Sequence, residues 1–81
     1  MREFIESIVK MIVDNPNEVV VTEKNGEHTL ICELRVNDTD MGKIIGKHGN
    51  MENSLRMLVA AVSAKEQKHT VFEIIDPKLN R

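Results

Sequence analysis

Aromatic residues are scarce in this sequence of 81 residues, which contains two Phe and neither Tyr nor Trp. Proteins that stack nucleic-acid bases on a sheet or in a barrel use exposed aromatic rings for this purpose. A stacking platform of the RRM or OB type is therefore excluded. Any recognition of a polymer by this chain must rest on backbone amides, a few cations and aliphatic side chains.

Cysteine is almost absent as well. Cys32 stands alone, which excludes an internal disulfide and a cysteine metal cluster, and its apolar neighbourhood predicts a small buried side chain. His28, His48 and His69 have no ligand spacing with one another or with Cys32, so we expect neither a metal nor another cofactor. No Ser or Cys shows a local signature of an activated nucleophile, and we do not expect an enzyme.

Long hydrophobic runs are also missing. Charged residues interrupt the apolar residues near the N-terminus, and no run resembles a signal peptide or a membrane span. We therefore expect a cytoplasmic protein with one domain over residues 1–81, a core at about 2–76 and a short polar tail at 77–81. A chain this short is near the lower limit for an unaided core, so a dimer would be a natural supplement.

The net charge of −2 hides an uneven distribution. Residues 1–40 carry four Lys/Arg against nine Asp/Glu, whereas residues 41–70 carry five against two. This pattern predicts a modest positive surface on an acidic body, which attracts phosphates locally and in a salt-dependent way.

Two periodicities alternate along the chain. Helical spacing of apolar residues and β-branched or alternating segments predict an order of helix, strand, strand, helix, helix, strand. Asn25-Gly26 predicts a type I′ turn between the first two strands. The two-helix crossover makes the second and third strands parallel neighbours. The expected fold class is α+β, a three-stranded mixed sheet covered on one face by three helices. The elements are expected over residues 2–13, 18–24, 28–36, 37–45, 50–65 and 69–75.

The helix expected over 50–65 has two apolar stripes. The first has the spacing of a core face: Met51, Leu55, Leu58, Val59 and Val62. The second has mostly small residues, which either simply favour helix or allow close contact with a helix of another chain: Met57, Ala60, Ala61 and Ala64. The second stripe is therefore a candidate dimer contact.

A tight turn, Gly46-Lys47-His48-Gly49, separates this helix from the one before it. Two glycines three apart let the backbone turn sharply and approach another chain closely. The N–H groups that open the second helix, with its dipole, favour an anion there, and Lys47 and His48 add polar side chains. The turn therefore predicts a seat for a phosphodiester backbone. A G-x-x-G alone is also typical of an ordinary helix junction. A nucleotide-binding P-loop is excluded, because no Ser or Thr follows the Lys and no strand precedes the segment.

The run Ile-Ile-Gly-Lys-His-Gly at residues 44–49 resembles the I-G-x-x-G signature of KH domains, whose G-x-x-G loop grips about four nucleotides. The order of elements resembles the type II KH arrangement. Asp40-Met41-Gly42-Lys43, the hairpin and the length resemble small single-domain RNA-binding proteins of the KhpA-like family. The resemblance extends to about Asp76. It implies cytoplasmic proteins that bind single-stranded RNA, form homodimers, partner a larger KhpB or Jag-like KH-containing protein, and act as post-transcriptional regulators or RNA chaperones.

The resemblance also implies roles for individual residues. The glycines would shape the clamp, the residues between them would meet the sugar-phosphate backbone, and the two isoleucines would line an apolar groove. Many relatives have arginine after the second glycine, whereas Asn50 keeps a hydrogen-bonding group and loses a charge. With Lys43, a cation just before the loop, the candidate RNA-binding residues are Gly46, Lys47, His48, Gly49, Ile45, Ile44, Lys43 and Asn50. Arg56, on the next helix, is a weaker candidate.

A second function remains open from the residues themselves. The acidic first half, Asn50 and the second apolar stripe also fit a KH-fold protein-interaction or dimerisation module with weak RNA affinity. The sequence does not separate RNA from single-stranded DNA, because no feature must read a 2′-hydroxyl. It also leaves open a homodimer or a mixed pair.

Overall fold

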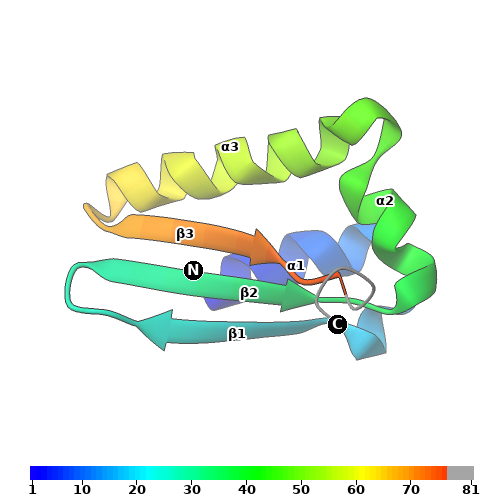
Figure 1. Ribbon diagram of the computed structural model, residues 1–81, viewed down its shortest axis with the longest axis horizontal. Coiled ribbons are helices and arrows are strands. Elements are labelled where there is room, and N and C mark those ends of the chain that lie inside the picture. The colour runs from blue at the N-terminus through cyan, green and yellow to red at the C-terminus, as the bar shows by residue number, and fades with distance from the viewer. Residues whose placement is uncertain (77–81) are drawn as a thin grey trace.

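The computed structural model describes residues 1–76, and the predicted polar tail at 77–81 lies outside the described residues. One layer of helices lies against one sheet (Figure 1). Three 3₁₀ turns, η1 (Pro16–Glu18), η2 (Asp38–Asp40) and η3 (Lys47–Gly49), lie between the main elements. The main helices and strands are α1 (Arg2–Ile12), β1 (Val20–Asn25), β2 (Thr29–Arg35), α2 (Met41–Ile45), α3 (Asn50–Lys65) and β3 (His69–Ile74).

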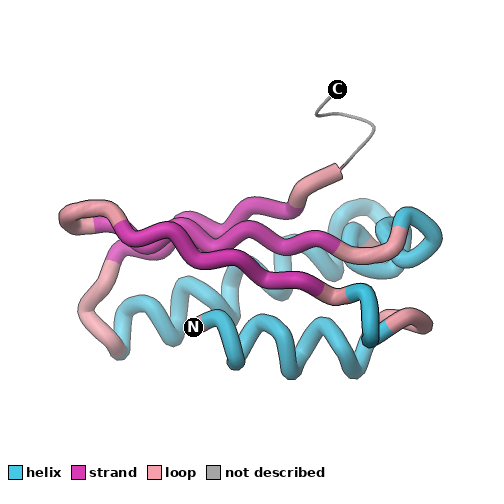
Figure 2. Tube along the Cα trace, turned by 90° about the horizontal axis from the view of Figure 1, so that it is seen from below, coloured by secondary structure: helices cyan, strands magenta, loops and turns pink. Residues whose placement is uncertain are grey.

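The sheet has the strand order β1-β2-β3, with β1 antiparallel and β3 parallel to β2. Figure 2 shows the helices of residues 1–76 on one face and at one end of the sheet, and none of them over the other face. Alternate residues of β2 therefore point into the protein, and Leu30, Cys32 and Leu34 are buried there. The predicted fold class, a three-stranded mixed sheet covered on one face by three helices, is confirmed.

The core lies between the sheet and the helices. Each helix contributes at least one buried aliphatic residue, and burying such a side chain stabilises a fold by roughly 1.5–3 kcal/mol. Cys32 is 0% exposed, and burial raises the pKa of its thiol, which fits a structural side chain. The residues that join the layers include Ile5, Val9, Leu34, Ile44, Leu55, Val59 and Phe72.

One prediction for α3 is wrong. Leu58 was expected in the core, but it is 45% exposed. Leu55 and Val59 are the residues of this stripe that turn to the sheet and are buried, while Met51 and Val62 are half-buried. Because α3 packs on β3 and α2, the side of the helix that carries Leu58 is left uncovered.

The turn type predicted for the hairpin is also wrong. Neither Asn25 nor Gly26 has a positive φ, which both central residues of a type I′ turn require. Asn25 remains in β1 and pairs with Leu30. The chain reverses after it, and the Gly26 N–H donates to the Thr29 carbonyl over 2.7 Å. The longer connection removes the need for a positive φ.

Candidate nucleic-acid interface

Residues 46–49, here called the glycine loop, join α2 to α3 at one end of the sheet (Figure 1). Three of the four residues have positive φ: Gly46 at 76°, His48 at 57° and Gly49 at 76°. Gly46 combines this φ with a ψ of 173°, a region open essentially to glycine alone. A Cβ on Gly46 would also lie 2.6 Å from Cβ of Met51, whereas one on Gly49 would meet nothing within 4 Å. The loop therefore depends more strictly on its first glycine.

Backbone hydrogen bonds close the loop tightly. The Gly46 N–H donates to the Gly42 carbonyl over 2.8 Å, and the Gly49 N–H donates to the Gly46 carbonyl over 3.2 Å. The 16-residue helix α3 begins immediately afterwards at Asn50, and no side chain caps its start. The Asn50 N–H donates to the Lys47 carbonyl. The N–H groups that follow Asn50 in the first turn of α3, together with the positive end of its dipole, therefore face an anion at the loop.

The charged side chains near the loop differ in their partners. Lys47 and His48 are exposed, and within residues 1–76 neither of them forms a salt bridge. Lys43 is bound to the carboxylate of Asp14, with 2.7 Å between Nζ and Oδ2. This hydrogen bond raises the pKa of the ammonium. The positive charge that is free on this surface therefore belongs to the loop.

Arg56 has a structural role in this arrangement. Its guanidinium is 2.9 Å from a carboxylate oxygen of Glu52 and donates to the backbone carbonyl of Phe72. It also lies 5.5 Å from the centre of the Phe72 ring. Arg56 therefore fastens α3 to β3, and we do not include it in the site.

The two isoleucines before the loop have different environments. Ile44 is 0% exposed and belongs to the core, whereas Ile45 is half-buried. The expectation that Ile44 lines a groove is corrected, because its side chain anchors α2 in the protein and offers no surface. Ile45 is the apolar side chain accessible beside the loop, and Asn50 is exposed on its other side.

Asp40 is a positioning residue that the sequence did not reveal. Asp40 stands immediately before α2 and is 0% exposed. The carboxylate accepts hydrogen bonds from the backbone N–H groups of Asp14 and Asn15, at 3.0 and 3.1 Å, and from the Asn15 side-chain amide at 3.0 Å. Burial raises the pKa of Asp40, but these donors and Lys43 outweigh it, and the net pKa is lowered. The carboxylate thus ties the turn after α1 to the base of α2.

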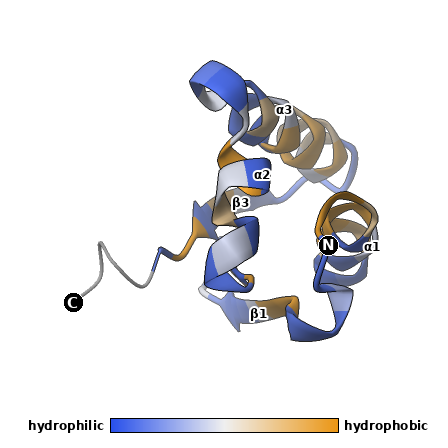
Figure 3. Cartoon of the chain, turned by 90° about the vertical axis from the view of Figure 1, so that its right-hand side faces the viewer, coloured by the Kyte–Doolittle hydropathy of each residue, from blue (hydrophilic) through white to orange (hydrophobic). Residues whose placement is uncertain are grey.

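The candidate dimer residues lie together on a different surface. Met57 is 72% exposed, and Ala60, Ala61 and Ala64 are exposed beside it, because residues three and four apart share one side of a helix. With Leu58 they make α3 apolar on its uncovered side. Figure 3, which looks at the end of the molecule with α2, shows hydrophobic residues along α3 and hydrophilic ones nearest the viewer.

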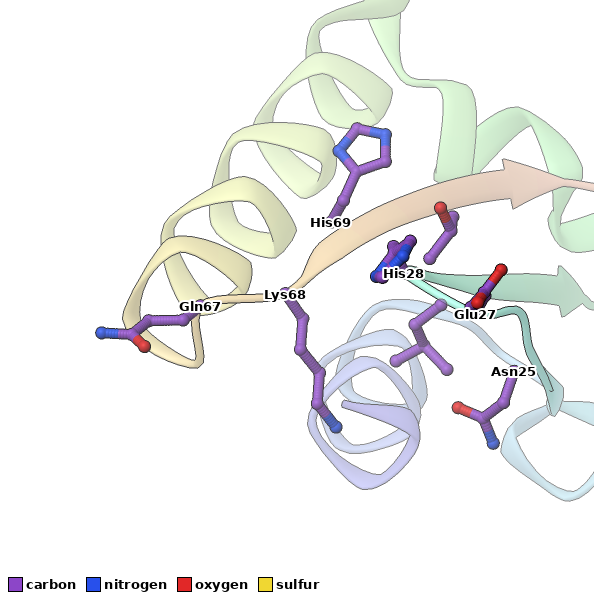
Figure 4. Close-up of a pocket in the computed structure, with 8 residues that line it drawn as sticks. Asn25, Glu27, His28, Gln67, Lys68 and His69 are labelled. Atoms are coloured by element: carbon purple, nitrogen blue, oxygen red, sulfur yellow. The ribbon is translucent and has the colours of Figure 1, made fainter.

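The opposite end of the sheet, here called the hairpin end (residues 25–30 and 67–69), also has a hollow, of about 480 Å³. It carries His28, Lys68 and His69. Figure 4 shows that Lys68 and His69 point in opposite directions. Because the Lys68 and His69 side chains diverge, this hollow does not direct both of them at one ligand, and the glycine loop is the better candidate site.

Residues 1–76 have neither a grouped set of metal ligands nor a membrane-spanning helix. No group of three or more His, Cys, Asp or Glu there is placed to hold a metal ion. No helix in the same part of the chain has the length and apolar character that crossing a membrane requires.

The sheet order, the crossover through α2 and α3 and the glycine loop together define a KH domain. The chain belongs to the KhpA/KhpB KH-domain family, whose model matches residues 2–74. The RNA-binding protein KhpA of Clostridium acetobutylicum is 45% identical over 75 residues, which is 93% of this chain and 100% of that protein. The corresponding protein of Clostridium perfringens is 47% identical over the same shares.

A more distant relative, the RNA-binding protein KhpA of Aquifex aeolicus, is 40% identical over 94% of this chain and 96% of that protein. No solved structure matches the chain. The names of these relatives describe RNA-binding proteins and no enzyme, in agreement with the expectation from the sequence.

Proposed function

We propose that this protein binds single-stranded RNA by gripping the sugar-phosphate backbone at the glycine loop. The observation that carries the proposal is the backbone of this loop, where Gly46, His48 and Gly49 hold positive φ immediately before an uncapped helix start. The relatives named RNA-binding protein KhpA support it.

Each residue of the site has a distinct task in this proposal. Gly46 and Gly49 let the RNA backbone approach the α3 amides closely. Lys47 and His48 contact phosphates from the exposed part of the loop, and Ile45 offers an apolar surface to a sugar or base. Because exposed aromatic platforms are lacking, the affinity is expected to rest on backbone contacts and to fall with salt.

Charge reversal in the loop tests this function. RNA binding is measured for the wild type and for Lys47→Asp/His48→Asp at two salt concentrations, with circular dichroism as a check of the fold. The matched control is Lys24→Asp/His28→Asp, which makes the same charge change at exposed residues of β1 and the hairpin. We expect salt-dependent binding that the loop variant loses and the control keeps. Equal loss in both variants, or no binding by the wild type, would contradict the proposal.

We also propose a homodimer through the uncovered side of α3. Alanines at positions 60, 61 and 64 allow another helix to approach closely, and Met57 and Leu58 would lose exposed apolar surface on contact. Two glycine loops in one dimer would bind one RNA with an increased effective concentration. A cytoplasmic location, a larger KhpB or Jag-like partner and a role as post-transcriptional regulator or RNA chaperone are further proposals, based on the family resemblance.

Light scattering tests the dimer contact. Met57→Asp is expected to yield a monomer, because it places a charge in the apolar contact. Met11→Asp is the matched control, since Met11 is 79% exposed but lies on α1, and this variant should keep the wild-type mass. An unchanged mass for Met57→Asp would remove this side of α3 as the contact.

A protein-interaction module with weak RNA affinity is the second candidate function. Exposed Met57 and Leu58 favour it, as does the engagement of Lys43 and Arg56 by carboxylates. Under this alternative, loop charge reversal would leave RNA binding equally weak, while Met57→Asp would abolish protein association.

A further inference from the structure

Lys43 is engaged by a carboxylate at the base of the proposed RNA site. Its Nζ lies 2.7 Å from Oδ2 of Asp14, and both side chains are accessible, at 46% and 71% exposure. Lys43 lies in α2 three residues before Gly46, a distance of about 5 Å along a helix axis. The backbone of Lys43 is therefore close to the loop, and its ammonium lies between α2 and the turn after α1.

The backbone of Asp14 is held in place by hydrogen bonds to Asp40. Its backbone N–H donates to Oδ1 of the buried Asp40 over 3.0 Å, and the neighbouring Asn15 donates to Oδ2 from both its backbone and its side chain. Asp40 immediately precedes α2. The same segment therefore fixes the backbone of Asp14 and carries Lys43, so the carboxylate and the ammonium are held opposite each other.

The salt bridge changes the charge that this surface offers to a phosphate. Lys47 has no salt-bridge partner within residues 1–76, whereas Asp14 neutralises Lys43. A phosphate that approaches Lys43 must displace a carboxylate that the fold keeps in place, and it is repelled by that carboxylate as well. Since both groups are accessible to water, such a displacement is feasible and is sensitive to salt.

We propose that Asp14 is an intramolecular competitor for Lys43, and that it lowers the affinity of the glycine loop for RNA by occupying the cation next to it. This inference rests on the proposed function. It assigns to the turn after α1 a task in RNA binding: Asp14 determines whether the strand gains one more phosphate contact beyond the loop.

The test is a double-mutant cycle in RNA binding, measured over a series of salt concentrations with wild type, Asp14→Asn, Lys43→Ala and the double variant. Asp14→Asn should bind about two- to fivefold more tightly at low salt, the range that an exposed ion pair allows. Its plot of log affinity against log salt should be steeper by about 0.7, the value for one more phosphate of a single strand. In the Lys43→Ala background the gain should vanish.

Two controls separate this effect from a change of total charge or of fold. Glu27→Gln removes one negative charge at the hairpin end, where Glu27 is exposed, and should change affinity by much less. Asp14→Ser keeps the backbone N–H that Asp40 binds and should reproduce the gain of Asp14→Asn. Circular dichroism checks that all the variants are folded.

The inference is overturned if Asp14→Asn binds like Glu27→Gln, or if its gain persists without Lys43. In either case the RNA site itself stands, provided that Lys47→Asp/His48→Asp loses binding. If neither the wild type nor Asp14→Asn binds RNA, the proposed function and the inference both fail.

Discussion

The two ends of the sheet carry similar residues but differ in how their polar side chains are arranged. Both have Lys, His and a residue outside glycine with positive φ, His48 at the glycine loop and Gln67 at the hairpin end. At the glycine loop, Ile44 in the core and Asp40 in a hydrogen-bonded network hold the short helix α2. At the hairpin end Lys68 and His69 diverge (Figure 4). The proposed RNA site therefore rests on a fixed loop backbone together with the exposed side chains of Lys47 and His48.

The largest difference between the ends should appear when a methyl group is added to a glycine. Gly46→Ala is expected to cost about 3 kcal/mol or more of unfolding free energy, because φ and ψ there are nearly closed to alanine and its Cβ would lie 2.6 Å from that of Met51. Gly26→Ala at the hairpin end should change it by about 1 kcal/mol at most, since the nearest atom is 3.3 Å away. Urea unfolding measures both, and equal costs would contradict the comparison.

Asp40→Asn should have the next largest effect, and that effect should depend on pH. The folded pKa of Asp40 is lowered, so its carboxylate stabilises the fold above the unfolded pKa of about 4. This contribution is lost as the pH falls through the lowered folded value. The variant should therefore melt several degrees below the wild type at neutral pH, and the gap should narrow as the pH falls below the unfolded pKa of about 4.

The control for this prediction is Glu27→Gln, an exposed carboxylate at the hairpin end that should change the melting temperature little. Melting curves at neutral and acid pH decide the matter. If the gap between Asp40→Asn and wild type were the same at both pH values, the ionised carboxylate would not be what fixes the base of α2.

The smallest expected change in unfolding free energy is at Gly49, the second glycine of the loop. Gly49→Ala should cost about 1 kcal/mol, because φ is positive but a Cβ would meet nothing within 4 Å. Gly49→Asn should cost less, since asparagine tolerates this left-handed conformation. Denaturant unfolding of both variants measures the difference. A cost for Gly49→Ala as large as that for Gly46→Ala would show that crowding by Met51 does not matter.

Local sequence patterns predicted much of the fold because they report on immediate neighbours. Alternation in β2 placed Cys32 and Leu34 on the buried face, and the two-helix crossover placed β3 parallel to β2. Leu58 was misplaced because the apolar stripe of α3 is wider than the surface that the sheet covers. A helical pattern gives the apolar side of a helix but not the extent to which other elements cover it.

In the candidate site, too, the local features were predictable from the sequence and the long-range contacts were not. The paired glycines marked the loop, since each has a positive φ that a tight turn requires. Asp40 escaped notice because its donors, Asp14 and Asn15, lie 26 and 25 residues earlier in the chain. Nothing in the local sequence indicates whether a carboxylate near a helix start faces water or a distant turn.

The central claim is that RNA binds at the glycine loop and not at the hairpin end. Titration of the isotope-labelled protein with a single-stranded RNA, followed by amide NMR, tests it residue by residue. The account predicts that the largest shifts occur in the amides of residues 45–51, with residues 26–28 and 67–69 nearly unchanged. Shifts centred on the hairpin end, or spread evenly over the surface, would contradict it.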